Sequence, residues 1–354
     1  MSTSRNLPVT EPHNEMQEDS GKTTVCEVAH VDPTQSNQVV DWNAFLASSD
    51  NGTLFHDLRF LAYHPCDRFD THHLIFRRNG KLLALFPAAI VTEPDGRRLL
   101  RSPYGGSVGG FVLSSAQHAD STIQLVNCLQ NYVTDQGLNG IETRTGPNVY
   151  AACPNDTLSF ALAASGFILS RRWLTHIIPL PAHPEDVLNK LPSRRRRGYI
   201  QSAIRHGLEV NAVGVSRLAA FYQMLHANRA KHGGGLTHTL SELERLYELV
   251  PDHMRLFVCE LQGQMIAGSL VFELNNRVSY SFYPCHDEKF EEYRPAALTT
   301  IRVAEYYSAR GFKYLDLGPS TFDDFAVNHG LARFKEDMGG IGFCRDTWRW
   351  EATK

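Results

Sequence analysis

Short apolar runs recur along this chain, and two pairs of them resemble each other. Residues 80–88 and 263–270 each begin at a glycine turn and continue as an apolar strand. Residues 137–142 and 311–316 each begin at the glycine that ends a helical pattern and close on an acid. The offset is 183 positions in the first pair and 174 in the second. Repetition at a nearly constant offset is typical of a duplicated α/β domain.

Hydrophobic periodicity assigns most of the first half to helices and strands. It predicts an opening helix with Val40, Phe45 and Leu46 on its apolar stripe. Further elements are strands near 72–78, 82–91, 108–113, 139–144 and 173–180 and helices near 121–136 and 157–164. Residues 1–35 are rich in Ser, Thr, Glu, Asn and Pro, so we expect a disordered tail there.

The second half repeats this mixture of elements. Periodicity predicts helices near 185–191, 194–206, 216–231 and 240–249, a meander of strands at 255–261, 264–273 and 277–284, and strands at 313–317 and 342–350. Thr239 and Glu242 have the spacing of a capping box. Pro295 can begin a helix that Gly311 ends. We therefore expect two tandem α/β domains, 36–180 and 181–354, with mixed, mostly antiparallel sheets and flanking helices.

Composition narrows the class of protein. A chain of 354 residues with 42% hydrophobic and 21% charged residues is long enough for two cores. The sequence contains neither a membrane-length apolar run nor a secretory h-region, and its seven cysteines form no CxxC pair. We therefore expect a cytoplasmic protein with no membrane span and no metal site. The net charge of −3 argues against a DNA-coating surface, although it leaves room for a local basic patch.

Residues 330–340 contain the pair Phe334 and Lys335 followed by a glycine-rich step, and residues 311–316 lead into a strand. In these features the chain resembles the GNAT acyltransferase superfamily in its double-domain Fem-type form. Fem-type enzymes transfer an amino acid from aminoacyl-tRNA to an amine on a peptidoglycan precursor. The resemblance implies two GNAT-like domains, a site for tRNA and no tightly bound cofactor. It also implies substrate contact by Phe334 and stabilisation of an oxyanion or a leaving group by Lys335.

Two departures from the family pattern leave the donor and the acceptor open. GNAT enzymes bind the CoA pyrophosphate with a glycine-rich loop, but residues 293–297 contain no glycine and Pro295 lacks an N–H donor. The long helical arm of cell-wall Fem enzymes is also missing from the pattern. Three hypotheses follow: an aminoacyl-tRNA-dependent transferase acting on a small-molecule or precursor amine, an acyltransferase that uses a thioester on an acyl carrier protein or CoA, and a non-catalytic binding module.

The ends of predicted strands supply further candidate residues. Asp316 ends a strand, a position that commonly faces the ligand crevice of α/β folds. It is a candidate to orient or deprotonate the amine, or it caps the following turn. Ser320 is a candidate hydrogen-bond donor. Tyr283 ends a strand of the meander and is a candidate for the cleft between the halves.

Two other segments are candidates for ligand contact. Arg194, Arg197 and Arg205 would lie on one side of a helix and match the geometry of phosphate groups, or they form a solvated helix face. Residues 101–110 are the most glycine-rich stretch. Glycines allow close approach to a ligand, so we expect Arg101 and Tyr104 to line a substrate loop, with a bulge in the sheet as the alternative.

Overall fold

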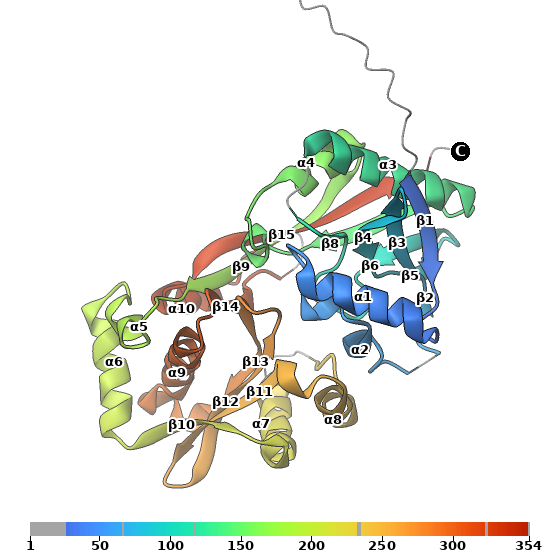
Figure 1. The fold of residues 1–354 in the computed structure, drawn as a ribbon. Helices are drawn as coiled ribbons and strands as arrows, with labels where there is room; N and C mark the ends of the chain where they lie inside the picture. Colours follow the sequence, from blue (N-terminus) through green and yellow to red (C-terminus); the bar gives the residue numbers. More distant parts are fainter. Residues whose placement is uncertain (1–25, 66, 116–117, 232–234, 323–324, 353–354) are drawn as a thin grey trace, which may run out of the picture.

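The computed structural model describes residues 26–352 except 66, 116–117, 232–234 and 323–324. Two groups of helices and strands lie at opposite ends of the molecule, and the long strands β9 and β15 run between them (Figure 1). The first half contains β1 Cys26–Val31, α1 Ser36–Ser48, α2 Leu58–Leu61, β2 Asp70–Thr71, β3 His73–Arg78, β4 Lys81–Phe86, β5 Ala89–Thr92, β6 Arg98–Ser102, β7 Val112–Leu113, α3 Ala119–Asp135, β8 Gly140–Thr145, α4 Thr157–Ala164 and β9 Ile168–Pro179.

The second half repeats the order of the first. It contains α5 Glu185–Asn189, α6 Arg194–Arg205, β10 Leu208–Val213, α7 Leu218–Lys231, α8 Leu240–Leu249, β11 Met254–Leu261, β12 Gln264–Glu273, β13 Val278–His286, α9 Pro295–Ala309, β14 Tyr314–Pro319, α10 His329–Asp337 and β15 Ile341–Glu351. The succession β1, α1, α2, β3, β4, α3, β8, α4, β9 corresponds to β10, α7, α8, β11, β12, α9, β14, α10, β15. The prediction of two tandem domains is therefore confirmed.

The glycines that suggested the duplication occupy equivalent turns. Gly80 and Gly263 have φ of 74° and 80°, and the residue before each also has positive φ. Two successive positive φ values are typical of the type I′ turn that joins hairpin strands. Gly137 and Gly311, with φ of 65° and 80°, follow α3 and α9. These positions need positive φ, which glycine adopts without steric cost.

The halves exchange their last strands. An eleven-stranded sheet has the order β10-β11-β12-β13-β14-β9-β15-β8-β6-β5-β2, and a four-stranded sheet has the order β1-β3-β4-β7. Strand β9 ends the first half but pairs with β14 of the second, while β15 ends the second half and pairs with β8 of the first. The eleven-stranded sheet therefore continues across the predicted boundary after residue 180, and that boundary stays a prediction.

Two sequence expectations need correction. The predicted tail is too long, because Cys26–Val31 forms β1 and its residues Cys26 and Val28 pack against the core of the first half. Residues 1–25 lie outside the described residues. The predicted strand 82–91 is two strands, β4 and β5, which belong to different sheets. Pro87 lies between them and cannot donate a backbone hydrogen bond to a ladder.

Apolar packing joins the two halves. Phe55 of the first half has its ring centroid 6.5 Å from that of Phe272 and 6.2 Å from that of Tyr280, both in the second half. These side chains belong to one buried cluster that draws residues from both halves. Each half also has a core of its own, under α3 and α4 and under α6 and α9. In the described part of the chain, no helix combines the length and apolar character needed to cross a membrane.

Candidate active site

Strands β13 and β14 position the candidate site. They pair in parallel over three residues, from Val278 to Tyr280 and from Tyr314 to Asp316. Beyond Asp316 the pairing with β13 stops and the backbone turns at Gly318, where φ is 79°. Polar groups at the carboxyl end of β14 are therefore free of β13, although the pairing of β14 with β9 continues to Pro319.

Asp316 lies at the centre of a buried hydrogen-bond network. Its Oδ2 accepts from Tyr150 Oη and from Arg345 Nη2, the latter at 2.6 Å. Its Oδ1 accepts from Thr175 Oγ1 at 2.8 Å and from the Gly318 amide at 2.6 Å. The side chains of Asp316 and Arg345 are 0% and 1% exposed. Every oxygen of this carboxylate has two partners, as a charge removed from water requires.

Electrostatics keep this pair ionised. Burial alone would raise the pKa of Asp316, but the Arg345 charge and the Tyr150 hydroxyl outweigh burial and lower the pKa below its usual value. Burial acts against the charge of Arg345 as well, and Asp316 reverses that effect and raises the Arg345 pKa. Arg345 also stacks over the Tyr280 ring, 4.8 Å from its centroid. Asp316 therefore fits a role in orientation, and its occupied lone pairs fit proton abstraction poorly.

Lys335 lies beside this network. It projects from α10, and its Nζ donates to the carbonyl oxygens of Gly318 and Pro319, each at 2.8 Å. The residue is 5% exposed. Burial lowers the Lys335 pKa to about 7, with Asp316 opposing and Arg345 adding to the shift. Two of the three N–H groups of the Lys335 ammonium donate to the turn after β14. The third N–H group is left for a ligand atom.

His176 and Ser320 extend the cluster on the far side of the turn. His176 Nδ1 lies 2.9 Å from Ser320 Oγ, and its Nε2 lies 3.5 Å from a Glu336 carboxylate oxygen. Burial lowers the His176 pKa and so favours the neutral ring. The Ser320 hydroxyl is thus engaged by His176, and a hydrogen bond from Ser320 to a substrate stays a prediction. No group of three or more metal-ligating side chains occurs among the described residues.

The glycine-rich loop is placed differently from the prediction. Tyr104 is 3% exposed, and its Oη lies 3.2 Å from His73 Nε2 within the cluster shared by the halves. Its ring packs against Phe69 at a centroid distance of 5.2 Å. Tyr104 is therefore a packed core residue and does not reach into an open cleft. Arg101 lies on β6 and forms an ion pair with Glu142 at 2.8 Å, which already satisfies its charge.

The other candidates are divided between the core and the surface. Tyr283 is buried, and its Oη contacts Thr237 Oγ1 at 2.6 Å and His238 Nδ1 at 2.8 Å. Phe334 is half-buried against the core of the second half. Substrate contact by Tyr283 and Phe334 stays a prediction.

The arginines of α6 differ in their surroundings. Arg194 and Arg205 are exposed. Arg197 Nη1 donates to the Leu191 carbonyl oxygen at 2.9 Å and is held against the protein. Arg196, which the sequence prediction did not single out, pairs with Asp337. The expected phosphate-binding group therefore reduces to Arg194 and Arg205.

Sequence reasoning missed Arg345 and Tyr150. Both are fully buried polar side chains that reach Asp316 from other elements, Arg345 from β15 and Tyr150 from the turn after β8. One signal was present for Arg345, since a charged residue within the predicted strand 342–350 demands a partner if the strand is buried. For Tyr150 the sequence held no such signal.

Comparison with known proteins identifies the fold. Residues 189–336 match the model of the acetyltransferase (GNAT) domain family. No curated protein sequence matches the chain. The structure is similar to that of FemX, with a TM-score of 0.70 and 14% identity, covering 92% of this chain and 97% of FemX.

Two further solved structures have the same arrangement. A tandem GNAT protein from the clavulanic acid biosynthesis pathway has a TM-score of 0.55 at 12% identity, covering 93% of this chain and 99% of its own. L-PGS from Bacillus licheniformis has a TM-score of 0.52 at 12% identity, covering 90% and 91%. At these identities the similarity establishes the fold of both halves.

Proposed function

We propose that this protein, which has the double-domain fold of the Fem-type GNAT acyltransferases, forms an amide by transferring an aminoacyl group to an amine. The donor in this proposal is aminoacyl-tRNA in the cytoplasm, and the acceptor is a small molecule or a biosynthetic precursor. One observation carries the proposal: the buried Lys335 ammonium is held by Gly318 and Pro319 where β13 and β14 part, beside an ion pair that is already neutralised.

The reaction needs little covalent chemistry from the protein. The acceptor nitrogen attacks the ester carbonyl carbon, a C–N bond forms, the C–O bond to the ribose breaks, and one proton passes from the amine to the leaving oxygen. Negative charge develops on the carbonyl oxygen during the attack. A preorganised positive donor in a water-poor site stabilises that charge strongly. The remaining N–H of Lys335 has this role in the proposal, and Asp316 and Arg345 hold the turn that positions it.

Two exposed arginines support a phosphate-rich donor. Arg194 and Arg205 lie on α6, and the described residues provide neither of them with an ion-pair partner. Such guanidinium groups bind phosphate with parallel hydrogen bonds. They fit a tRNA backbone or the phosphopantetheine of a carrier protein.

A thioester donor is the second candidate, because the matching family model is that of an acetyltransferase domain. Its weakness lies at the start of α9, where GNAT enzymes bind the CoA pyrophosphate. Here Arg294 has a left-handed conformation with φ of 57°, and Pro295 begins the helix without an N–H. This departure counts more against free CoA than against a carrier protein, whose partner surface adds contacts.

The test is to supply the three donors separately. The protein is incubated with a mixture of amines and with labelled aminoacyl-tRNA, acetyl-CoA or an acyl-carrier thioester, and mass spectrometry follows donor loss and amide gain. We expect amide only with aminoacyl-tRNA, formed about 10²–10³-fold more slowly by the Lys335→Ala protein. Amide from a thioester alone would select the second candidate. Equal donor loss with wild type and Lys335→Ala would contradict both and favour a binding module.

A further inference from the structure

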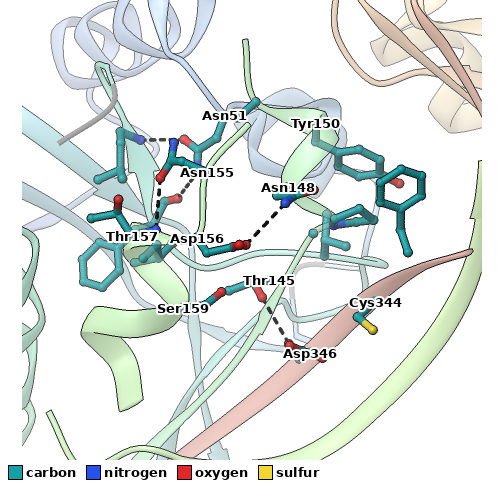
Figure 2. Close-up of a pocket in the computed structure, with 18 of the residues that line it drawn as sticks. Asn51, Thr145, Asn148, Tyr150, Asn155, Asp156, Thr157, Ser159, Cys344 and Asp346 are labelled. Atoms are coloured by element: carbon teal, nitrogen blue, oxygen red, sulfur yellow. Dashed lines mark hydrogen bonds between the residues drawn. The ribbon is translucent and has the colours of Figure 1, made fainter. Parts of the chain in front are cut away.

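The first half contains an open pocket of about 510 Å³ at the carboxyl end of β8. Its walls come from the turn after α1, the segment from Thr145 to Tyr150, the first turn of α4 and strand β15 (Figure 2). The volume lies within the range of pockets that enclose small ligands. Lys335 and Asp316 are not among its lining residues, so this pocket is separate from the candidate active site.

The pocket is the counterpart of the candidate active site in the repeated fold. Strands β6 and β8 pair in parallel as far as Ser102 and Thr143, as β13 and β14 do in the second half. The segments after β8 and the start of α4 then line the pocket. The equivalent segments after β14 and in α10 carry Ser320 and Lys335. The duplication therefore provides a second crevice in which the chemistry differs.

The charge of this pocket is negative. Asp50, Asp156 and Asp346 line it together with Arg172. Arg172 contacts both oxygens of Asp346, at 2.7 and 2.8 Å, so this pair is neutral. Asp50 Oδ1 accepts from the Cys153 amide at 3.0 Å, and Asp156 Oδ1 accepts from an Asn148 side-chain amide at 3.3 Å (Figure 2).

The second oxygen of Asp50 and that of Asp156 have no hydrogen-bond partner among the described residues. His56 adds no positive charge to the pocket, because burial lowers its pKa to about 4. Arg277 lies near Asp50 and offsets part of its charge, whereas Asp156 forms no ion pair among the described residues. The pocket therefore keeps a net negative charge that favours a cationic ligand.

A buried donor in the same pocket is unpaired. Trp348 lines the pocket and is 8% exposed, and its Nε1, which only donates, has no hydrogen-bond partner among the described residues. An unpaired buried donor costs free energy that a ligand oxygen would recover. Thr157 and Ser159 also line the pocket and contribute hydroxyl groups to it (Figure 2). The pocket thus offers carboxylates for a cation and donors for an oxygen.

We propose that this pocket is a second binding site, for a small primary amine that also carries hydroxyl or carbonyl oxygens. The proposal does not require the transferase function to be correct. Tyr150 links the two regions, since it lines the pocket and donates to the buried Asp316. An amine bound here therefore shares a wall with the candidate active site, as a waiting acceptor or as an effector.

Cys344 provides a reporter for this pocket. It is exposed and lines the wall on β15 (Figure 2). The full-length protein is treated with cationic 2-aminoethyl or anionic 2-sulfonatoethyl methanethiosulfonate, and peptide mass spectrometry measures the rate at Cys344 relative to free cysteine. We expect the cationic reagent to be favoured about tenfold, as for a small ligand entering a charged cleft. Asp50→Asn with Asp156→Asn should reduce this preference at least about threefold, and Glu209→Gln on β10 should not.

Protection of Cys344 tests the ligand class. Millimolar glucosamine should slow labelling, whereas N-acetylglucosamine, which lacks the charge, should not. Trp348→Phe should weaken protection by about threefold to tenfold, the loss of one hydrogen bond, with Trp350→Phe as the matched control. Equal rates for both reagents, an unchanged preference in the double variant, or no protection by glucosamine or ethanolamine would overturn the proposal. Adding the acyl donor distinguishes the two roles of the bound amine. An amine that is converted to an amide is an acceptor, and an amine that is not converted is an effector.

Discussion

The carboxyl ends of β8 and β14 occupy equivalent places in the repeated order of elements but carry their charges differently. Glu142 on β8 is half-buried and pairs with Arg101 at 2.8 Å, whereas Asp316 on β14 is fully buried and pairs with Arg345. In the exchanged strands, Arg172 on β9 is 43% exposed and Arg345 on β15 is 1% exposed. The same backbone positions thus hold surface ion pairs in one half and a buried network in the other.

The following helices differ in the same sense. Leu162 on α4 is 1% exposed and belongs to the core of the first half. Lys335, at the equivalent place on α10, sends its ammonium to the turn after β14. A leucine at this position contributes only packing, whereas a lysine brings a titratable charge next to Asp316. Duplication supplied the scaffold twice, and the charged cluster formed in the second half.

The largest expected effect comes from breaking the buried ion pair. Arg345→Met leaves the Asp316 carboxylate buried without its cation, so we expect a loss of about 3–5 kcal/mol in the free energy of unfolding. Arg172→Met removes the equivalent arginine from a partly exposed pair and should cost less than about 1 kcal/mol. Urea unfolding followed by circular dichroism measures both. Similar losses of unfolding free energy in the two variants would contradict the conclusion that the buried Arg345 pair stabilises the protein more than the partly exposed Arg172 pair.

The second prediction concerns Lys335 and Leu162. Lys335→Ala should lower turnover by about 10²–10³-fold, because it removes a charged donor from the developing oxyanion, and should leave the fold intact. Lys335→Arg should rescue only partly, since the guanidinium fork is larger and planar. Leu162→Ala should instead destabilise the protein by about 2–5 kcal/mol through a cavity. Steady-state rates and unfolding curves separate these effects, and normal turnover in Lys335→Ala would remove the catalytic assignment.

The third prediction uses the Lys335 pKa of about 7. If the ammonium stabilises the oxyanion, the active form is protonated, so activity is full below pH 7 and falls as the pH rises through about 7. If the neutral amine acts as a base, the dependence has the opposite sign. The pH profile of kcat, with the Lys335→Arg protein as a control that stays charged, distinguishes the two. An activity that rises through pH 7 would contradict the oxyanion role.

Much of the fold was predictable because its signals are local. The turn glycines at 80 and 263 indicated the duplication. The capping box predicted for Thr239 and Glu242 is present at the start of α8. The exchange of β9 and β15 was not predictable, because strand pairing is decided by contacts between segments far apart in the chain. Strand β1 was missed for a related reason: its short pattern acquires meaning only when it pairs with β3.

The candidate site divides in the same way. Asp316 and Lys335 were found because one ends a strand and the other stands in a family motif, and the structure brings both to the turn at Gly318. The network around Asp316 depends on Arg345 and Tyr150, which arrive through the strand exchange. Tyr104 was misjudged because a glycine-rich loop indicates close contact with another group but does not identify that group. Here the loop packs against aromatic side chains of the protein's own core.

The smallest expected effect concerns α6, which precedes the repeated order and has no equivalent in the first half among the described residues. Arg194→Glu with Arg205→Glu should weaken tRNA binding about tenfold at low salt, because two phosphate contacts become repulsive, and the difference should shrink as salt rises. Arg98→Glu with Arg171→Glu makes the same charge change on the first half and should have a smaller effect. Anisotropy of labelled tRNA across a salt series measures both. Equal weakening by the two double variants would show that net charge, and not α6, governs binding, and the arginines of α6 would then be a solvated helix face.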